Sequence, residues 1–290
     1  MKKYFLLIFL LSVVTTVLYS KNIVYLSSLN SDKEGIFQDI LLTSPPLFKV
    51  KKIGRLSLTI SSSIGSYDNQ NVFIAGYSDI YLFNINNPEP SKFNKLTFQS
   101  VFKDIGKVIF ISNENKKTYL YSGDVDRGFL QDKAIRNIRK IAGVTPVNNY
   151  FPVYRISKQE IFFLYRSDDY TFIKYNLFTG KIEFIKIDNC YPALWRDKTN
   201  ELVCINQDKK SKNNYFYAQA NGKIDSYFKL RGDLFLYMPD SDEAVMNIPE
   251  YFSDGVYSAI YNFSTGEVKK IPDGVNLYPG SSIYLNQGVD

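Results

Sequence analysis

A short turn that occurs three times at nearly constant spacing most restricts how this chain of 290 residues can fold. In each copy a polar residue, a glycine and a charged residue follow one another, and strand-like sequence lies on both sides. The glycines at positions 180, 222 and 266 are 42 and 44 residues apart. A period in this range is typical of a β-propeller or a related array. The three copies are residues 175–181, 218–223 and 261–267.

The sequence before each turn repeats as well. An acidic residue opens a strand, and an aromatic residue precedes it at steps of 41 and 42 residues. Each unit therefore contains four strands, and the aromatic content of 16% suits strands because flat rings pack well on a pleated surface. Residues 145–272 contain three such units. The acidic residues are Glu160, Glu201 and Glu243, the aromatic residues are Tyr154, Trp195 and Tyr237, and the strands leaving the turns are 181–187, 223–230 and 267–271.

The N-terminal half repeats the same unit less regularly. Turns between third and fourth strands are expected near Pro46, near Asn87-Pro88 and in a stretched loop at 124–132. Together with the three glycine turns they predict a six-bladed β-propeller of four-stranded antiparallel blades. Seven blades is the alternative. Residues 23–27, 36–43 and 48–53 form a unit without a first strand, while 276–278 lie where a first strand should be and 282–286 resemble a second strand.

That distribution predicts how the ring closes. One blade completed by strands from both termini would bury edges that would otherwise stay open. We therefore expect residues 21–290 to form a single all-β domain.

The first twenty residues differ from the rest. Lys2 and Lys3 precede an uncharged, mostly apolar run at 4–18, which is shorter than a membrane-spanning helix needs. This pattern predicts a signal peptide at 1–20, cleaved after Ser20, and hence a periplasmic or secreted protein. An uncleaved N-terminal anchor is the alternative and would be the only contact with a membrane. No cysteine lies near the site, so a lipoprotein anchor is not supported.

The charge balance gives no sign of a nucleic-acid partner. The formal net charge of +6 falls to +4 when Lys2 and Lys3 are removed. So small an excess on an exported protein does not argue for nucleic-acid binding. We interpret the basic runs at 49–52 and 136–140 as solvated strand edges.

The sequence contains no histidine. Nucleophile systems of the Ser-His-Asp and Cys-His kinds are therefore excluded, because no imidazole can carry the proton near neutral pH. The usual imidazole sites for zinc, copper and iron are absent too. Residues 123–128 alternate carboxylates as in a calcium loop but lack the later acidic ligands of such loops. We expect no metal site and no cofactor.

Carboxylate-pair chemistry remains open because it needs only Asp and Glu at a suitable separation. Asp168 and Asp169 lie with Arg166 and Tyr170 in a loop between two strands. A polar turn held by local hydrogen bonds is the favoured interpretation of this loop. A glycan-acting enzyme that uses one of these acids is the alternative.

Cys190 and Cys204 are the only cysteines, and both belong to one predicted hairpin. One register places them on opposite faces, and the other places them on one face with a diagonal offset. Neither arrangement suits ordinary disulfide geometry. We therefore favour two small buried residues over a disulfide.

The repeat resembles the TolB-like six-bladed β-propeller, within the broad group of WD40-like repeats. The resemblance rests on residues 192–204, on 215–223, and on the matching stretches 154–181 and 237–270. It implies the propeller fold and a binding role. It does not extend to the N-terminal α/β domain of TolB itself, for which about 270 mature residues leave no room, nor to TolB's own partners.

Binding residues are expected in loops that the repeat does not require, since loops vary while blades must keep packing. The aromatic residues in step with the repeat are instead assigned to packing between blades. We predict an exported, non-catalytic, monomeric module that binds a protein or peptide of the cell envelope, with a small-ligand-binding propeller as a further alternative. The candidate binding residues are Tyr150, Arg166, Asp168, Asp169, Tyr170, Arg231 and Tyr251.

Overall fold

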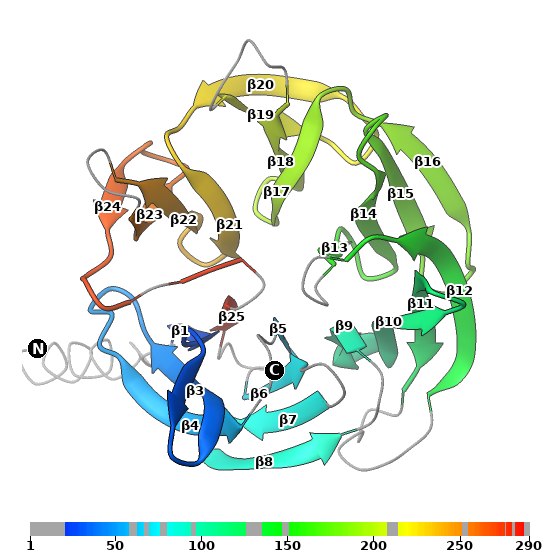
Figure 1. Cartoon of the computed structure of the whole chain (residues 1–290). Coiled ribbons are helices and arrows are strands. Elements are labelled where there is room, and N and C mark those ends of the chain that lie inside the picture. The colour runs from blue at the N-terminus through cyan, green and yellow to red at the C-terminus, as the bar shows by residue number, and fades with distance from the viewer. Residues whose placement is uncertain are drawn as a thin grey trace, which may run out of the picture.

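The computed structural model describes most of the chain from Lys21 onwards, and its strands form a ring of sheets around a central axis (Figure 1). An all-β propeller of antiparallel blades, as predicted, is confirmed. The described residues are 21–57, 63–66, 70–75, 80–93, 97–125, 135–146, 151–207, 214–250, 255–275, 277–279 and 282–286. The expected signal peptide at 1–20 lies outside them.

Five sheets have four strands each, and within each the first strand in sequence lies nearest the axis and the fourth lies outermost (Figure 1). The first two sheets are β5 (Ser63–Ser66), β6 (Asn71–Ala75), β7 (Ile80–Asn84) and β8 (Asn87–Phe93), then β9 (Thr97–Phe102), β10 (Lys107–Glu114), β11 (Lys117–Asp124) and β12 (Arg136–Val144). The short 3₁₀ helix Lys103–Ile105 joins β9 to β10. The next is β13 (Tyr154–Arg155), β14 (Glu160–Arg166), β15 (Thr171–Asn176) and β16 (Ile182–Lys186). The last two are β17 (Cys190–Arg196), β18 (Glu201–Asn206), β19 (Asn214–Ala218) and β20 (Ile224–Lys229), then β21 (Asp233–Met238), β22 (Glu243–Pro249), β23 (Val256–Asn262) and β24 (Val268–Lys270).

The sixth sheet closes the ring with strands from both ends of the described chain. Its members are β1 (Lys21–Leu26), β2 (Asn30–Asp32), β3 (Gly35–Thr43), β4 (Lys51–Ser57) and β25 (Ser282–Asn286). β25 pairs antiparallel with β1, from Lys21↔Asn286 to Tyr25↔Ser282. Closure by both ends is thus confirmed. The prediction for residues 282–286 was wrong, because they form the innermost strand of this sheet and not a second strand.

Two other strands differ from the sequence prediction. A turn between third and fourth strands was expected at Asn87-Pro88, but the outermost strand β8 already begins at Asn87. Pro88 and Pro90 are tolerated there because the strand is outermost and needs fewer backbone donors. The strand expected at 48–53 is shifted as well, since β4 begins only at Lys51.

Two of the three repeated glycine turns, those at Gly180 and Gly266, share one set of hydrogen bonds. The side chain of Asn176 accepts from the N–H groups of Phe178 (3.1 Å) and Thr179 (2.9 Å), and Gly180 N–H donates to the Asn176 carbonyl (2.9 Å). Gly180 has a φ of 76°, which costs little only without a Cβ. Asn262 and Gly266 repeat these contacts in the last four-stranded blade. The repeat therefore encodes a turn between third and fourth strands, as predicted.

Apolar side chains fill the spaces between neighbouring sheets. Tyr25, Tyr175 and Tyr215 are among the largest fully buried side chains. Trp195 and Tyr237 are buried near the ends of the innermost strands β17 and β21, and each belongs to a cluster drawn from two sheets. Their recurrence in the sequence therefore reflects packing between blades.

A buried ion pair joins the last two four-stranded blades. Arg196, at the end of β17, donates from Nε to Oδ1 of Asp242 (2.7 Å) and from Nη2 to Oδ2 (2.6 Å). The Asp242 side chain is only 2% exposed, and it also accepts from the hydroxyl groups of Tyr237 (3.0 Å) and Ser264 (3.2 Å). The Arg196 guanidinium lies over the Phe263 ring at 4.9 Å. Hydrogen bonds from Arg196 therefore lower the pKa of Asp242 to about 2.

Cys190 and Cys204 form a disulfide, so the interpretation of two separate thiols was wrong. Pro192 pairs with Cys204 and Cys190 pairs with Asn206, which puts both cysteines on one face with a diagonal offset. A register shift at Ala193, between Pro192 and Leu194, kinks β17. The Cα atoms lie 5.0 Å apart, within the usual range for a disulfide.

Candidate functional site

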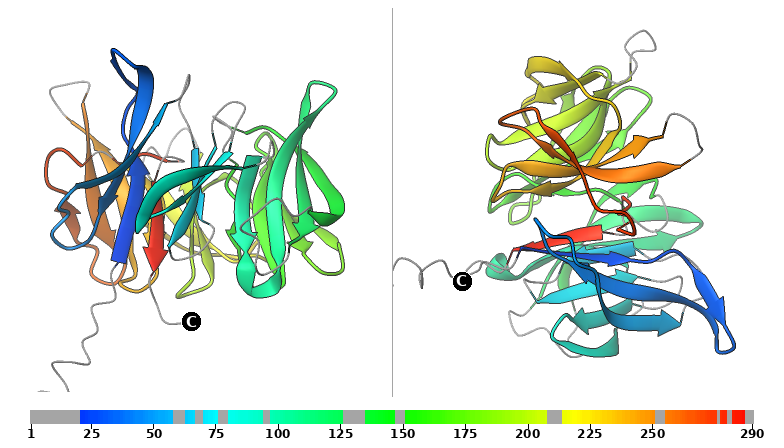
Figure 2. Two further views of the ribbon diagram at one scale, coloured as in Figure 1. Left: turned by 90° about the horizontal axis from the view of Figure 1, so that it is seen from below. Right: turned by 90° about the vertical axis from the view of Figure 1, so that its left-hand side faces the viewer.

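The order of strands within a blade determines where the candidate binding residues gather. Turns between first and second strands and between third and fourth strands lie at one end of an antiparallel blade. Turns between second and third strands, and connections to the next blade, lie at the other end. We call this second end the hairpin face, because the hairpin of β2 and β3 projects there (Figure 2). β1 begins and β25 ends on the opposite face.

The predicted residues come from connections of the hairpin face. The loop 166–170 joins β14 to β15, and Arg231 lies between β20 and β21. Tyr150 and Tyr251 lie outside the described residues, so the structure does not place them. The sequence thus directed attention to one face of the ring, although it did not show how these residues lie relative to one another.

The 166–170 loop has the character of a polar turn. Asp168 and Asp169 are exposed, Asp168 Oδ1 accepts from Asp169 N–H (3.1 Å), and Asp169 Oδ1 accepts from Thr171 N–H (3.2 Å). Tyr170 is half-buried with a φ of 54°, as turn residues can be. Arg166 is exposed, and its guanidinium lies over the Tyr165 ring at 5.1 Å. The two carboxylates are therefore engaged in shaping the turn, and nothing in this geometry favours their use as an acid and base pair.

Arg231 braces two connections of the hairpin face. Its Nη2 donates to the carbonyl oxygen of Pro249 (2.8 Å), at the end of β22. The neighbouring Gly232 carbonyl accepts from the Tyr215 hydroxyl (2.6 Å), which in turn accepts from Leu234 N–H at 3.3 Å. Arg231 thus ties the entry of the last four-stranded blade to its second strand.

The projecting hairpin in the closing sheet is the feature that sequence reasoning missed. β3 pairs with β1 up to Leu26↔Ile40, and then with β2 from Asn30↔Phe37. Between these two pairs the segment from β1 to β2 contains residues 27–29, whereas β3 contains only residues 38 and 39. The extra residue marks a bulge at residues 27–29. Beyond the bulge, β2 and the start of β3 extend past the other described turns (Figure 2).

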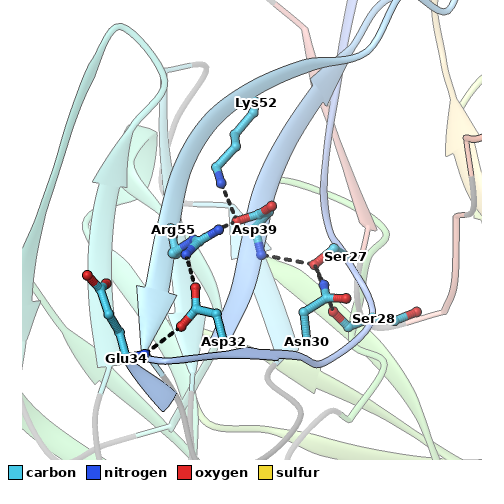
Figure 3. Close-up of polar contacts among 8 residues, drawn as sticks. All are labelled: Ser27, Ser28, Asn30, Asp32, Glu34, Asp39, Lys52 and Arg55. Carbon is cyan, nitrogen blue, oxygen red and sulfur yellow. Dashed lines mark hydrogen bonds and ion pairs between the residues drawn. The ribbon is translucent and has the colours of Figure 1, made fainter. Parts of the chain in front are cut away.

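Ser27 and its neighbours fix the bulge. Ser27 N–H donates to the Asp39 carbonyl and Asp39 N–H donates to the Ser27 hydroxyl, both at 2.9 Å. The Ser27 carbonyl accepts from the side chain of Gln38 (2.8 Å), which is buried. Asn30 Nδ2 donates to the Ser28 carbonyl (2.8 Å). The polar groups that the bulge removes from strand pairing therefore form hydrogen bonds with neighbouring residues (Figure 3).

Arg55 ties the hairpin to the outermost strand of the same sheet (Figure 3). From β4 it donates through Nη1 to Oδ2 of Asp32 (2.7 Å) and through Nε to Oδ1 of Asp39 (3.1 Å). Its guanidinium lies 3.5 Å from the centre of the Phe37 ring, and Lys52 pairs with Asp39 at 2.6 Å. The Glu34 N–H and Arg55 together lower the pKa of Asp32. We call Asp32, Phe37, Asp39, Lys52 and Arg55 the hairpin brace.

The hairpin also exposes apolar side chains. Leu29, in the bulge, is 43% exposed and Ile36, on β3, is 46% exposed. A braced element that presents apolar groups is suited to contact a protein surface. The signal in the sequence was the turn Asp32-Lys33-Glu34-Gly35 together with an acidic residue at 39 and a basic residue at 55. Because these residues lie on the consecutive strands β2, β3 and β4, the register between those strands brings them together.

The described residues contain no group of three or more Asp, Glu or Cys side chains that could hold a metal ion. Asp124, from the segment that partly resembles a calcium loop, forms an ion pair with Lys107 and accepts from Asn137 at 2.7 Å. The rest of that segment, from Asp126 to Gly128, lies outside the described residues. In the part of the chain that the structure describes, no helix has the length and apolar character to cross a membrane.

Solved structures with the same arrangement are numerous. TolB from Acinetobacter baumannii has a TM-score of 0.66 at 12% identity, with 92% of this chain and 67% of that chain covered. The fold is that of the TolB-like propellers. A putative TolB from Agrobacterium tumefaciens has a TM-score of 0.56 at 8% identity, covering 92% of this chain and 97% of the other.

The fold is not restricted to proteins described as TolB. A chain of a nidogen/laminin complex matches with a TM-score of 0.59 at 7% identity, covering 92% of this chain and 98% of its own length. No protein-family model and no curated protein matches the sequence. Identities this low establish the fold alone, so the role of this TolB-like propeller depends on its own residues.

Proposed function

We propose that this TolB-like propeller is an exported, non-catalytic module that binds a protein or peptide of the cell envelope through its hairpin face. The observation that carries the proposal is the braced hairpin of β2 and β3, which projects beyond the blades with Leu29 and Ile36 exposed. The same fold in a chain of a nidogen/laminin complex is consistent with such a role.

Rigidity supports a binding role for this hairpin. A contact that orders a mobile loop loses free energy to conformational entropy, while a contact with a preorganised loop avoids that cost. Here Arg55 ties Asp32 and Asp39 to one another. Ser27 donates a hydrogen bond to the Asp39 carbonyl and accepts one from the Asp39 N–H. The hairpin can therefore present Leu29 and Ile36 in one fixed arrangement.

Two further features support export and orientation. The sequence at 1–20 has the pattern of a signal peptide. β1 begins and β25 ends on the face opposite the hairpin (Figure 2), so an N-terminal anchor, if retained, would leave the hairpin face directed away from the membrane.

Site-specific photo-crosslinking tests the proposal. A photoreactive amino acid is placed at Ile36, and in a matched variant at Val268, which is 42% exposed on the outer strand β24. The protein is produced in its native host and irradiated in intact cells. We expect a discrete crosslinked partner from position 36 and none from position 268.

Two results would contradict the proposal. Equal crosslinking from positions 36 and 268 would show that the hairpin is not the binding surface. Recovery of the mature chain in the cytoplasmic fraction after cell fractionation would refute export, independently of the crosslinking result.

A further inference from the structure

The outermost strand of every blade has one edge with no partner among the described strands. Such an edge presents backbone N–H and C=O groups that can pair with another extended chain, and proteins commonly protect it with proline, charge, bulges or short length. The six outer strands of this ring differ in which of these protective features they carry.

Five of the six outer strands contain a proline, have a register shift in their pairing or are only three residues long. β8 contains Pro88 and Pro90, and β24 has only three residues. β4 and β12 are basic and have register shifts in their pairing. β20 has a register shift near Ala218.

β16 has none of these three features, although it carries the charged residues Glu183 and Lys186. It pairs with β15 in five consecutive regular positions, from Thr171↔Lys186 to Tyr175↔Ile182. It contains no proline and no glycine. Its outer edge is therefore a regular row of backbone groups, with the Lys186 carbonyl close to Gly222 of the next blade, and the partner that fits such a row is an extended chain.

The side chains of β16 determine which extended chain would fit. Ile182 and Phe184 point to the same side of the sheet because they are two residues apart, and they are 38% and 62% exposed. Phe184 contacts the Tyr165 ring, with centroids 5.9 Å apart. An added strand would lay alternate side chains beside Ile182 and Phe184, so apolar residues at alternate positions are favoured.

The charges at β16 favour acidic ends on the added strand. Lys181 precedes the strand and Lys186 ends it, and both are exposed, with Lys186 in an exposed ion pair with Asp188 at 3.3 Å. The only carboxylate within the strand, Glu183, is paired with Lys174 at 2.9 Å. An acidic residue of an added peptide would therefore meet positive charge at Lys181, and at Lys186 it would compete with Asp188 for an exposed ion pair.

We propose that the free edge of β16 is a second binding surface, which takes an extended peptide segment of a partner protein by strand addition. The segment carries apolar residues at alternate positions and acidic residues at its ends. β16 lies across the ring from β2 and β3 (Figure 1). The surface is thus separate from the hairpin and does not depend on the function proposed for it.

Selection from a phage-displayed library of random short peptides tests this inference, with residues 21–290 as the target. Peptides with alternating apolar residues and acidic ends should be enriched. Their affinity should fall about tenfold or more for Phe184→Lys, because a lysine on the edge opposes strand addition. Tyr227→Lys is the matched control, since Tyr227 is also 62% exposed on an outer strand. That variant should bind as the parent protein does.

Amide hydrogen exchange then locates the bound peptide, with slower exchange expected at Ile182–Lys186. The inference is overturned if enriched peptides bind both lysine variants equally, if no peptide of this pattern is enriched, or if protection maps to another strand. It is also overturned if sedimentation reveals a dimer that Phe184→Lys dissociates, because a second copy would then be the occupant. Ile36→Lys should leave peptide binding unchanged, so failure at the hairpin and failure at β16 can be distinguished.

Discussion

Two arginines in this ring form similar contacts but have different surroundings. Arg196 joins two blades and binds Asp242, whose side chain is almost completely excluded from water. Arg55 joins three strands of one sheet and binds Asp32 and Asp39 at the surface. Buried charges are costly to leave unpaired, whereas exposed pairs add little to stability because water and salt screen them. The first arrangement therefore holds the ring together, and the second determines the shape of a projecting surface.

The largest expected effect is that of removing the buried charge. Asp242→Asn keeps the size of the side chain and tolerates the φ of 53° at this position. It leaves Arg196 without its main partner, and we expect the free energy of unfolding to fall by about 4 kcal/mol. Urea unfolding followed by circular dichroism measures this.

Asp104→Asn is the control, because Asp104 also binds an arginine through both oxygens, with Arg155 at 2.9 and 2.7 Å, but is half exposed. An equal loss of stability in the two variants would contradict the distinction between buried and exposed pairs.

The disulfide is expected to have the next largest effect. Replacing both Cys190 and Cys204 by alanine removes a link across 14 residues, and we expect a loss of about 3 kcal/mol. Thermal unfolding of the parent protein with and without reductant gives an independent measure. A variant as stable as the parent would mean that the disulfide does not change the free energy difference between the folded and unfolded states.

Acid should weaken the buried contact between Arg196 and Asp242. The pKa of Asp242 is lowered from 3.8 to about 2, so its ionised form stabilises the fold above about pH 4. This stabilisation is lost as the pH falls through 2, and from the shift of the pKa we expect a loss of about 2 kcal/mol. Between pH 5 and 2 the parent protein should therefore lose more stability than Asp242→Asn, so the difference between their free energies of unfolding should narrow by about 2 kcal/mol. A constant difference would contradict the assignment of the acid sensitivity to Asp242.

The smallest effect on global stability is expected at the hairpin brace. Arg55→Ala removes exposed contacts, so the unfolding midpoint should stay close to that of the parent protein. Amide hydrogen exchange in β2 and the start of β3 should nevertheless become faster, and more so at low salt, where the contacts of the parent are strongest. Unchanged exchange would show that Ser27 and the bulge hold the hairpin without Arg55.

The sequence predicted the regular part of the fold because that part is encoded locally. The Asn176 and Asn262 side chains fix identical turns, and the period between the glycines carries the blade spacing. The closing sheet was harder to predict because β25 and β1 are partners from opposite ends of the chain. The disulfide was missed because the diagonal offset of the two cysteines, which one of the two registers predicted, was judged unsuitable, whereas the structure brings their Cα atoms to 5.0 Å.

The candidate site was predicted only in part for the same reason. Arg166 to Tyr170 and Arg231 were assigned from breaks in the repeat, and these breaks do mark connections of one face. The hairpin brace needs Asp32, Asp39 and Arg55 from three strands, and neither spacing nor composition relates them. A sequence-based prediction can locate the loops where the repeat is interrupted. The contacts that the residues of these loops make depend on the tertiary fold.

The pairing of Lys21 with Asn286 has a consequence for the order in which the protein acquires its structure. β1 is synthesised first among the described strands, yet its inner neighbour β25 is synthesised last. The other blades can assemble from consecutive strands, but this one must wait for nearly the whole chain. Because contacts between distant residues form slowly, ring closure is expected to limit the folding rate. Until then the ring is an open arc, and if the protein is exported as proposed, a chain still crossing the membrane would remain in that unfinished state.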